Sequence, residues 1–270
     1  GYGSESAIYW ANPENNKLGW EKSQNFNVGF DWNLFGVVDL GVEYYNKYTS
    51  SLIFSMPASA VTGFSSYTSN IGNLLNDGVE VEVSSRNFNR KNFTWTTDFN
   101  FTWQRSIVKN LPNDGADITY GDGGMYLHRE GESMYSFYLP KWKGVNRETG
   151  LGEFWVDPED ESKGVTNFYS EAGSTIVGKA LPDFVGGMTN TFLFYGVDLS
   201  FMFQFSLGND VYNATRMYLT QSRNERVNLV KEIADRWTPT NASTKVPSAT
   251  GYIPYDVTSR FIEDGSFLRL

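Results

Sequence analysis

Large apolar residues alternate with polar residues along several segments of the chain. Residues 25–32, which read NFNVGFDW, place an aromatic or aliphatic side chain at every second position. The same alternation is found in residues 38–48, 79–84, 93–103, 184–194 and 197–206. A period of two residues is typical of β-strands that have one apolar and one polar face. The pattern therefore predicts an all-β protein.

The lengths of the predicted strands and connections indicate a membrane barrel. The strands run to about 10–12 residues, longer than the ~5–6 of globular sheets and close to the ~9–11 that cross a bilayer. The connections at 33–36, 86–91 and 195–196 are tight, whereas those at 49–77, 104–132 and 207–265 are long. Short turns at one rim and long loops at the other are typical of outer-membrane barrels.

Aromatic residues mark both ends of the predicted strands. Trp32, Phe93 and Phe194 lie next to the short turns, and Tyr48 and Trp103 lie next to the long loops. Two such girdles are expected at the two membrane surfaces. We therefore predict an antiparallel transmembrane β-barrel segment with long extracellular loops. A soluble carbohydrate-binding β-sandwich is the alternative, because its strands alternate as well.

The middle of the chain and the last long loop complete the predicted elements. Residues 133–143 and 151–157 are interpreted as two further wall strands around a turn at 144–150. They bring the prediction to eight strands, and residues 266–270 begin a ninth. Residues 223–237 have apolar side chains at helical spacing, which predicts a short amphipathic helix in the last loop. A helix packed in a soluble core is the alternative for that segment.

Composition narrows the possible functions. The 270 residues include 31 acidic and 22 basic side chains, and a net charge of −9 argues against a nucleic-acid binder. The absence of cysteine excludes disulfides, zinc–thiolate sites and thiol nucleophiles in this sequence. Mean hydropathy is −0.40, and no apolar run of ~18 residues predicts a transmembrane helix. The chain starts without a signal peptide and ends inside an apolar run, so we expect a fragment of a longer protein.

The polar face of the predicted strands is mostly acidic. Its charged residues are Asp31, Asp39, Glu43, Glu80, Glu82, Asp98 and Asp198, against Lys47. The simpler interpretation is that these acids keep a water-filled wall hydrated. The alternative is an electrostatic surface for a cationic ligand or a plug domain.

Catalytic and metal-binding patterns are missing from the sequence. The single histidine, His128, follows a glycine-rich stretch at 121–124, and no G-x-S-x-G nucleophile elbow occurs. The acidic run at 157–161 lacks the ligand spacing of a calcium loop. We therefore expect no catalytic residue, no metal site and no cofactor, which argues against an outer-membrane barrel enzyme.

Several motifs, in order, resemble the SusC/RagA-type TonB-dependent outer-membrane transporters. The resemblance is carried by NP at 12–13, LGWEKS at 18–23, VEYYNK at 42–47, NIG at 70–72, NDGVE at 76–80, SFY at 136–138, PDF at 182–184, RWTP at 236–239 and SRFIEDGSFLRL at 259–270. Together these motifs span nearly the whole chain.

The resemblance implies a 22-stranded barrel that is plugged by an N-terminal domain. Residues 1–270 then belong to the barrel domain, and the plug domain, the TonB box and the last strands lie outside this chain. The family implies import of oligosaccharides or peptides across the bacterial outer membrane, within outer-membrane lipid. A SusD-like surface lipoprotein and the TonB–ExbB–ExbD energy system are the implied partners, and no nucleic acid is involved.

Aromatic residues in the predicted loops are the candidate ligand contacts. Tyr120, Tyr126 and Trp142 could stack on sugar rings, and His128 could make a weak ligand contact. Packing within the loops or a place in an aromatic girdle is the alternative for the three aromatic residues, and a solvated loop residue is the alternative for His128. The motifs that resemble the family lie in the barrel wall, so no ligand residue follows from the resemblance.

Overall fold

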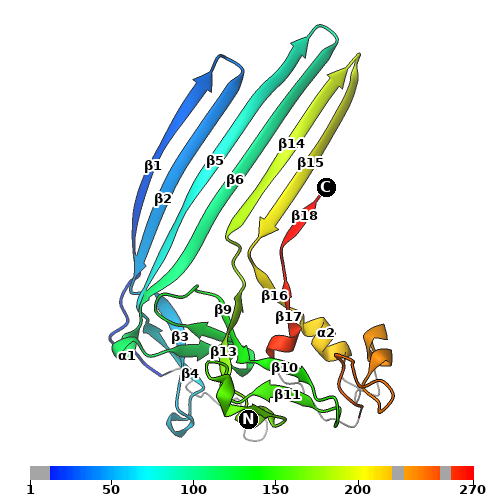
Figure 1. The fold of residues 1–270 in the computed structure, drawn as a ribbon. Coiled ribbons are helices and arrows are strands. Elements are labelled where there is room, and N and C mark those ends of the chain that lie inside the picture. The colour runs from blue at the N-terminus through cyan, green and yellow to red at the C-terminus, as the bar shows by residue number, and fades with distance from the viewer. Residues whose placement is uncertain (1–12, 221–227, 250–256) are drawn as a thin grey trace, which may run out of the picture.

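The structure is a computed structural model that describes residues 13–220, 228–249 and 257–270. Its main element is a seven-stranded antiparallel sheet, here called the wall, in the order β1-β2-β5-β6-β14-β15-β18 (Figure 1). Its strands are β1 (Lys22–Leu34), β2 (Val38–Ser50), β5 (Asn73–Arg90), β6 (Phe93–Asn110), β14 (Phe184–Phe194), β15 (Val197–Leu207) and β18 (Phe267–Arg269). The three short turns lie together at one end of the wall, and the long connections lie at the other. This arrangement confirms the predicted barrel segment.

The register of the wall brings the apolar residues of neighbouring strands side by side. Phe30 pairs with Val42, Val42 with Val81, and Val81 with Phe101. Directly paired residues point to the same face of a sheet. The aromatic and aliphatic residues therefore form one continuous face, and the acidic residues share the opposite face.

The wall is a single layer of sheet. Residues of β1 from Lys22 to Asn33 are exposed on both faces of the strand, whereas a β-sandwich covers one face of each sheet with the other sheet. The soluble sandwich alternative is therefore wrong. β1 and β18 are the two edges of the wall, and within the described residues the sheet does not close into a barrel.

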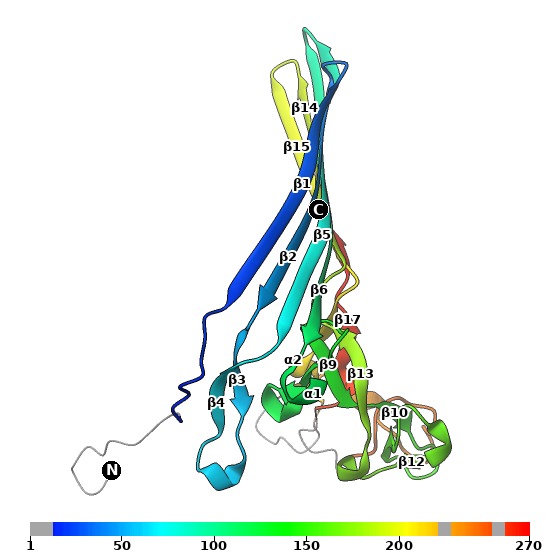
Figure 2. The ribbon, with the colours of Figure 1, turned by 90° about the vertical axis from the view of Figure 1, so that its left-hand side faces the viewer.

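The long connections build a second region, here called the loop layer, below the wall (Figures 1 and 2). Among the described residues, it contains four small sheets. Two of them are strand pairs, β3 (Ile53–Pro57) with β4 (Ser66–Asn70), and β16 (Asp210–Tyr212) with β17 (Ile262–Asp264). A third sheet consists of β7 (Ile118–Tyr120), β8 (Tyr126–His128), β9 (Ser136–Pro140) and β13 (Ser174–Lys179), and the fourth of β10 (Trp142–Val145), β11 (Gly152–Trp155) and β12 (Val165–Thr166). Its helices are α1 (Pro112–Gly115), α2 (Ala214–Leu219) and 3-10 helices at Ala60–Thr62, Asp122–Gly124, Glu161–Lys163, Tyr169–Glu171, Lys231–Asp235 and Ser259–Phe261.

The loop layer has its own apolar core where it meets the wall. Met56, Ile71, Val108, Ile118 and Met134 are buried against one another. They come from the first two long connections and from the ends of the wall strands. These connections are therefore folded units, not extended loops.

The prediction of two wall strands in the middle of the chain is wrong. Residues 133–143 and 151–157 contribute to β9, β10 and β11, which pair within the loop layer. The hairpin of β10 and β11 around 146–151 is present, but outside the wall. Residues 111–183 thus form one long connection, and the wall has six long strands plus β18, the predicted ninth. The error arose because any half-buried strand alternates, in a wall or in a loop.

The predicted helix at 223–237 is also wrong within its described part. Only Lys231–Asp235 is helical there, as a 3-10 helix that buries Ile233, and residues 221–227 lie outside the described residues. The α-helix of this connection, α2, begins earlier, where the side chain of Asn213 accepts a hydrogen bond from the backbone N–H of Arg216. Within the described residues, no helix is long and apolar enough to cross a membrane.

Candidate ligand-binding loops and polar wall

Three of the four predicted ligand residues lie together in the loop layer. β7 pairs antiparallel with β8, which places Tyr120 opposite Tyr126 and Ile118 opposite His128. The Tyr120 ring stacks on His128 with 4.2 Å between centroids, and on Tyr126 with 5.2 Å. Short antiparallel pairing thus brings together aromatic residues that are several positions apart in the sequence.

His128 is the most enclosed member of this aromatic cluster. The residue is 1% exposed, and Phe54 packs edge-on against the imidazole at 4.9 Å, so the alternative of a solvated loop residue is wrong. Neither ring nitrogen has a hydrogen-bond partner among the described residues. Burial lowers the pKa of His128 to about 4, although the nearby backbone of Met134 acts in the opposite direction. The imidazole is therefore neutral at physiological pH.

The two tyrosines of the cluster are anchored by the loop layer. The Tyr120 hydroxyl donates a hydrogen bond to the backbone oxygen of Met134 at 3.1 Å, and burial raises its pKa above the usual value. Tyr126 stacks on Phe137 with 5.3 Å between centroids. Both rings are only partly exposed. Contact with a ligand stays a prediction for these residues.

Trp142 lies apart from the cluster, on β10. The Arg260 guanidinium lies 5.3 Å from the centre of its ring, and Phe154 packs edge-on at 5.2 Å. The backbone N–H of Trp142 donates to the Ser259 hydroxyl at 2.9 Å. Burial lowers the pKa of Arg260 to about 10. Trp142 therefore joins the second long connection to the third, and its own ligand contact stays a prediction.

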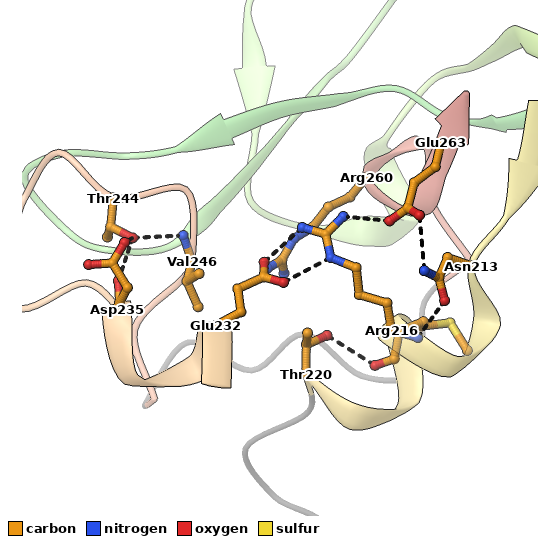
Figure 3. Close-up of polar contacts among 10 residues, drawn as sticks. Asn213, Arg216, Thr220, Glu232, Asp235, Thr244, Val246, Arg260 and Glu263 are labelled. Carbon is orange, nitrogen blue, oxygen red and sulfur yellow. Dashed lines mark hydrogen bonds and ion pairs between the residues drawn. The ribbon is translucent and has the colours of Figure 1, made fainter. Parts of the chain in front are cut away.

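An ion-pair network holds the third connection together (Figure 3). The Arg216 guanidinium makes two hydrogen bonds to Glu232, at 2.9 and 2.8 Å, and a third to Glu263 at 3.0 Å. Asn213 donates to the other oxygen of Glu263 at 3.0 Å. The bonds from Arg216 lower the pKa of Glu232. The network joins α2, the helical turn at 231–235 and β17, and sequence reasoning did not find it.

Neutral side chains donate hydrogen bonds to some of the carboxylates on the acidic face of the wall. Asn27 donates to Glu43 at 2.8 Å, and Ser84 donates to Asp98 at 2.6 Å. A groove of about 430 Å³ on this face includes Asp31, Asp39 and Glu82 among its lining residues. Within the described part of the chain, no ion pair neutralises these carboxylates. The face therefore presents a negative surface.

Comparison with known proteins relates the wall to the β-barrels of TonB-dependent receptors. The sequence profile of a family described as "TonB dependent receptor-like, beta-barrel" matches residues 1–214. TonB-dependent receptor P3 of Formosa agariphila is 33% identical over 95% of this chain, and TonB-dependent receptor SusC of Bacteroides thetaiotaomicron is 27% identical over 73%. The chain spans 27% and 20% of the lengths of these curated relatives. Both are named as receptors, and neither as an enzyme.

A solved structure shares the fold over the whole chain. The structure of the RagAB peptide transporter superposes with a TM-score of 0.87 over 100% of this chain and 30% of that chain. The two sequences are 24% identical, so this similarity supports the fold alone. It agrees with the wall and the loop layer described above, and the loop layer thus corresponds to a part of that fold.

Proposed function

We propose, from the premise that this chain belongs to the TonB-dependent receptor β-barrel family, that the complete protein imports nutrients across the bacterial outer membrane by TonB-dependent transport. The chain is a segment of an outer-membrane barrel. Because it spans less than a third of its curated relatives, we assign residues 1–270 to the barrel domain. A plug domain and a TonB box, which receives energy from the TonB–ExbB–ExbD system, belong to other parts of the protein.

The single observation that carries this proposal is the one-layer wall with two different faces. Rows such as Phe30–Val42–Val81–Phe101 form the apolar face, which suits lipid tails. The opposite face carries the carboxylates and suits a water-filled lumen. A wall of this kind separates lipid from an aqueous path.

The loop layer is the part that we assign to recognition. It lies at the end of the long connections, which in outer-membrane barrels is extracellular. Val61 and Phe168 are large apolar side chains exposed on it, and exposed apolar groups are common where a partner binds. We propose a SusD-like surface lipoprotein as that partner, because one curated relative is named SusC.

The charge of the lumen face limits the cargo that we propose. Carboxylates without ion pairs attract cations and repel anions. A neutral oligosaccharide or a basic peptide therefore fits this face better than an acidic molecule, and the solved relative is titled a peptide transporter. We also propose Tyr120, Tyr126 and Trp142 as ligand-binding residues, and His128, which is 1% exposed, as the buried ring that positions Tyr120 for this contact. Trp142 is the first to test, since its ring is partly exposed and bridges two long connections.

The test uses the full-length protein in its native outer membrane. Membrane fractionation and affinity purification are expected to give a heat-modifiable barrel with a stoichiometric lipoprotein. Uptake of a labelled neutral oligosaccharide, a basic peptide and an acidic peptide then follows. Recovery as a freely soluble monomer, or equal uptake of the acidic peptide, contradicts the corresponding part of the proposal.

Matched variants connect uptake to the two surfaces. Glu80→Gln combined with Glu82→Gln is expected to reduce uptake of the basic peptide and to leave that of the neutral oligosaccharide unchanged. Trp142→Ala is expected to weaken binding of the imported cargo. Asp117→Asn, in an exposed ion pair with Arg129, is the control, and its uptake should equal that of the wild type.

A further inference from the structure

Arg260 is a cation that the loop layer buries almost completely. Its side chain is 9% exposed, and burial lowers its pKa to about 10, so the guanidinium is still charged at neutral pH. A buried charge is costly unless an opposite charge and several hydrogen bonds compensate for it. The contacts of the guanidinium therefore show why an arginine is placed here.

An ion pair does not explain the position of Arg260. Its Nη2 atom lies 3.9 Å from Oε1 of Glu232, too far for a hydrogen bond. Both carboxylate oxygens of Glu232 accept shorter hydrogen bonds from Arg216, at 2.9 and 2.8 Å (Figure 3). Among the described residues, Nη2 of Arg260 has no hydrogen-bond partner. Glu232 is therefore mainly the partner of Arg216.

Aromatic rings receive the Arg260 guanidinium instead. Its central carbon lies 5.3 Å from the ring centre of Trp142 and 5.3 Å from that of Phe261. A cation at such a distance is attracted by the negative face of the ring, and more strongly where water is excluded. Phe261 is buried, whereas Trp142 is partly exposed. The guanidinium thus contacts the Trp142 ring from its buried side.

The backbone on both sides of Arg260 is fixed. The side chain of Thr258, which is buried, accepts a hydrogen bond from the backbone N–H of Arg260 at 3.3 Å and caps the 3-10 helix that follows. The backbone oxygen of Phe261 accepts a hydrogen bond from the backbone N–H of Asn213 at 2.8 Å. The guanidinium therefore extends from a rigid turn.

The strand that carries Trp142 holds its ring less firmly. β10 is an edge strand of its sheet, and its register with β11 is irregular between Trp142 and Gly144. Irregular pairing of this kind re-aims side chains and is common beside functional sites. The backbone N–H of Trp142 donates to Ser259 Oγ at 2.9 Å. The turn that carries Arg260 therefore holds both the backbone and the ring of Trp142.

We propose that Arg260 is a positioning residue for the ligand contact of Trp142. This inference rests on the proposed function, in which the exposed part of the Trp142 ring meets the cargo. The guanidinium keeps the ring in one orientation before the cargo arrives. Ordering a side chain during binding costs affinity, and a ring that is ordered in advance avoids this cost. The gain corresponds to about 2- to 10-fold in Kd.

The segment at 259–270 then serves recognition as well as the wall. Its first two residues, Ser259 and Arg260, hold Trp142. Farther along the segment, β17 pairs with β16, and β18 pairs with β15 in the wall. One short segment thus connects a proposed ligand residue of the loop layer to the barrel.

Hydroxyl-radical footprinting of the full-length receptor, read by mass spectrometry, measures the position of the ring without any cargo. Arg260→Met removes the guanidinium and keeps an unbranched side chain. Glu232 retains its two hydrogen bonds from Arg216, so the variant leaves no carboxylate without a partner. Oxidation of Trp142 is expected to rise about 2-fold, because the ring loses the cation that holds it.

Two other tryptophans and a second arginine are the controls. Oxidation of Trp155 and Trp237, on the second and third connections, should stay unchanged in Arg260→Met. Arg129→Met removes another guanidinium, 5.9 Å from the ring centre of Tyr138, and should leave Trp142 unchanged. Equal increases at all three tryptophans in Arg260→Met show a general loosening and overturn the proposal, as does an unchanged Trp142.

A double-mutant cycle then tests the effect on binding. The Kd values of a labelled basic peptide and a labelled neutral oligosaccharide are measured for the wild type, Arg260→Met, Trp142→Ala and the double variant. Arg260→Met is expected to raise the Kd of the probe that binds by about 2- to 10-fold when Trp142 is present, and to have no effect in Trp142→Ala. Equal losses in both backgrounds overturn the positioning role.

Failure of the proposed function gives a different result. An unchanged Kd in Trp142→Ala refutes the ligand contact itself, whereas a weaker Kd in Trp142→Ala with no effect of Arg260→Met refutes the positioning role alone. If Arg260→Met does not fold, Arg260→Lys retains the buried charge without the planar guanidinium. The same differences in oxidation and in Kd are then expected, and their absence overturns the proposal.

Discussion

Acidification is expected to open the aromatic cluster of the loop layer through His128. The folded pKa of about 4 lies below the ordinary value of ~6.5 for an unfolded chain. The unfolded cluster therefore binds the proton more tightly, so stability is complete above about pH 6.5 and falls as the pH drops toward 4. Proton binding therefore lowers the stability of the cluster by about 2 kcal/mol at pH 5 and by about 3 kcal/mol below pH 4.

Hydrogen exchange in the full-length receptor measures this effect locally. Amides of β7, β8 and β9 should open about 30-fold more often at pH 5 than at pH 7.5, after correction for intrinsic exchange. The wall amides serve as the internal reference, because their hydrogen bonds do not depend on this residue. Measurements stay at or above pH 5, where carboxylates with ordinary pKa values are mostly ionised.

The matched variant for this prediction is His128→Phe, which keeps a ring beside Tyr120 and Phe54 but removes the titrating group. Its β7–β9 amides should show no pH dependence beyond the intrinsic correction. A wild-type protein without the slope would show that the imidazole is not buried as described. A slope that persists in the Phe variant would assign the effect to another group.

Three further changes test other parts of the structure. Arg216→Ala should destabilise the third connection by about 1–2 kcal/mol, a value between those typical of exposed and of buried ion pairs. Hydrogen exchange of the α2 amides should become faster. Arg129→Ala, which breaks an exposed ion pair, should have a smaller effect. Gly150→Ala adds a methyl group against the Trp237 ring at φ of 72°, and should release the 237–248 segment to limited proteolysis, which unchanged cleavage would contradict. Phe35 has a left-handed backbone with φ of 55°, which Asn adopts more readily than Phe, so Phe35→Asn should stabilise this turn by about 1 kcal/mol in detergent. A lower melting temperature of the variant would contradict this reasoning.

The wall could be predicted from the sequence because its register repeats the pattern of every strand. Phe30, Val42 and Phe101 alternate within their own strands and then pair across strands. Local periodicity and long-range pairing therefore contain the same information. The long connections lack this agreement: residues 136–140 alternate like a wall strand, but pair with β8 and β13.

Contacts within the candidate site can be predicted from the sequence only where the partners are close along the chain. Tyr120, Tyr126 and His128 fall within one short hairpin, so their contact follows from local pairing. Trp142 meets Arg260 across more than a hundred residues, and no pattern in the sequence indicates that contact. The network of Arg216 is similar, since Glu263 is 47 positions away. Only the start of α2, which belongs to this network, has a signal in the sequence, because Asn is a common residue at the position that Asn213 occupies before residues 214–219.

The two ends of the wall have different physical requirements, and this separates anchoring from recognition. At the short-turn end, turns of two or three residues leave no room for a core, so only a surface outside the chain can cover the aromatics. At the other end, connections such as residues 111–183 bury Leu127, Phe137 and Leu139 among themselves, which allows their surfaces to vary while the wall register stays fixed. Substitutions that change cargo without disturbing the barrel should therefore fall in the loop layer, and those that change membrane depth should fall at the short turns.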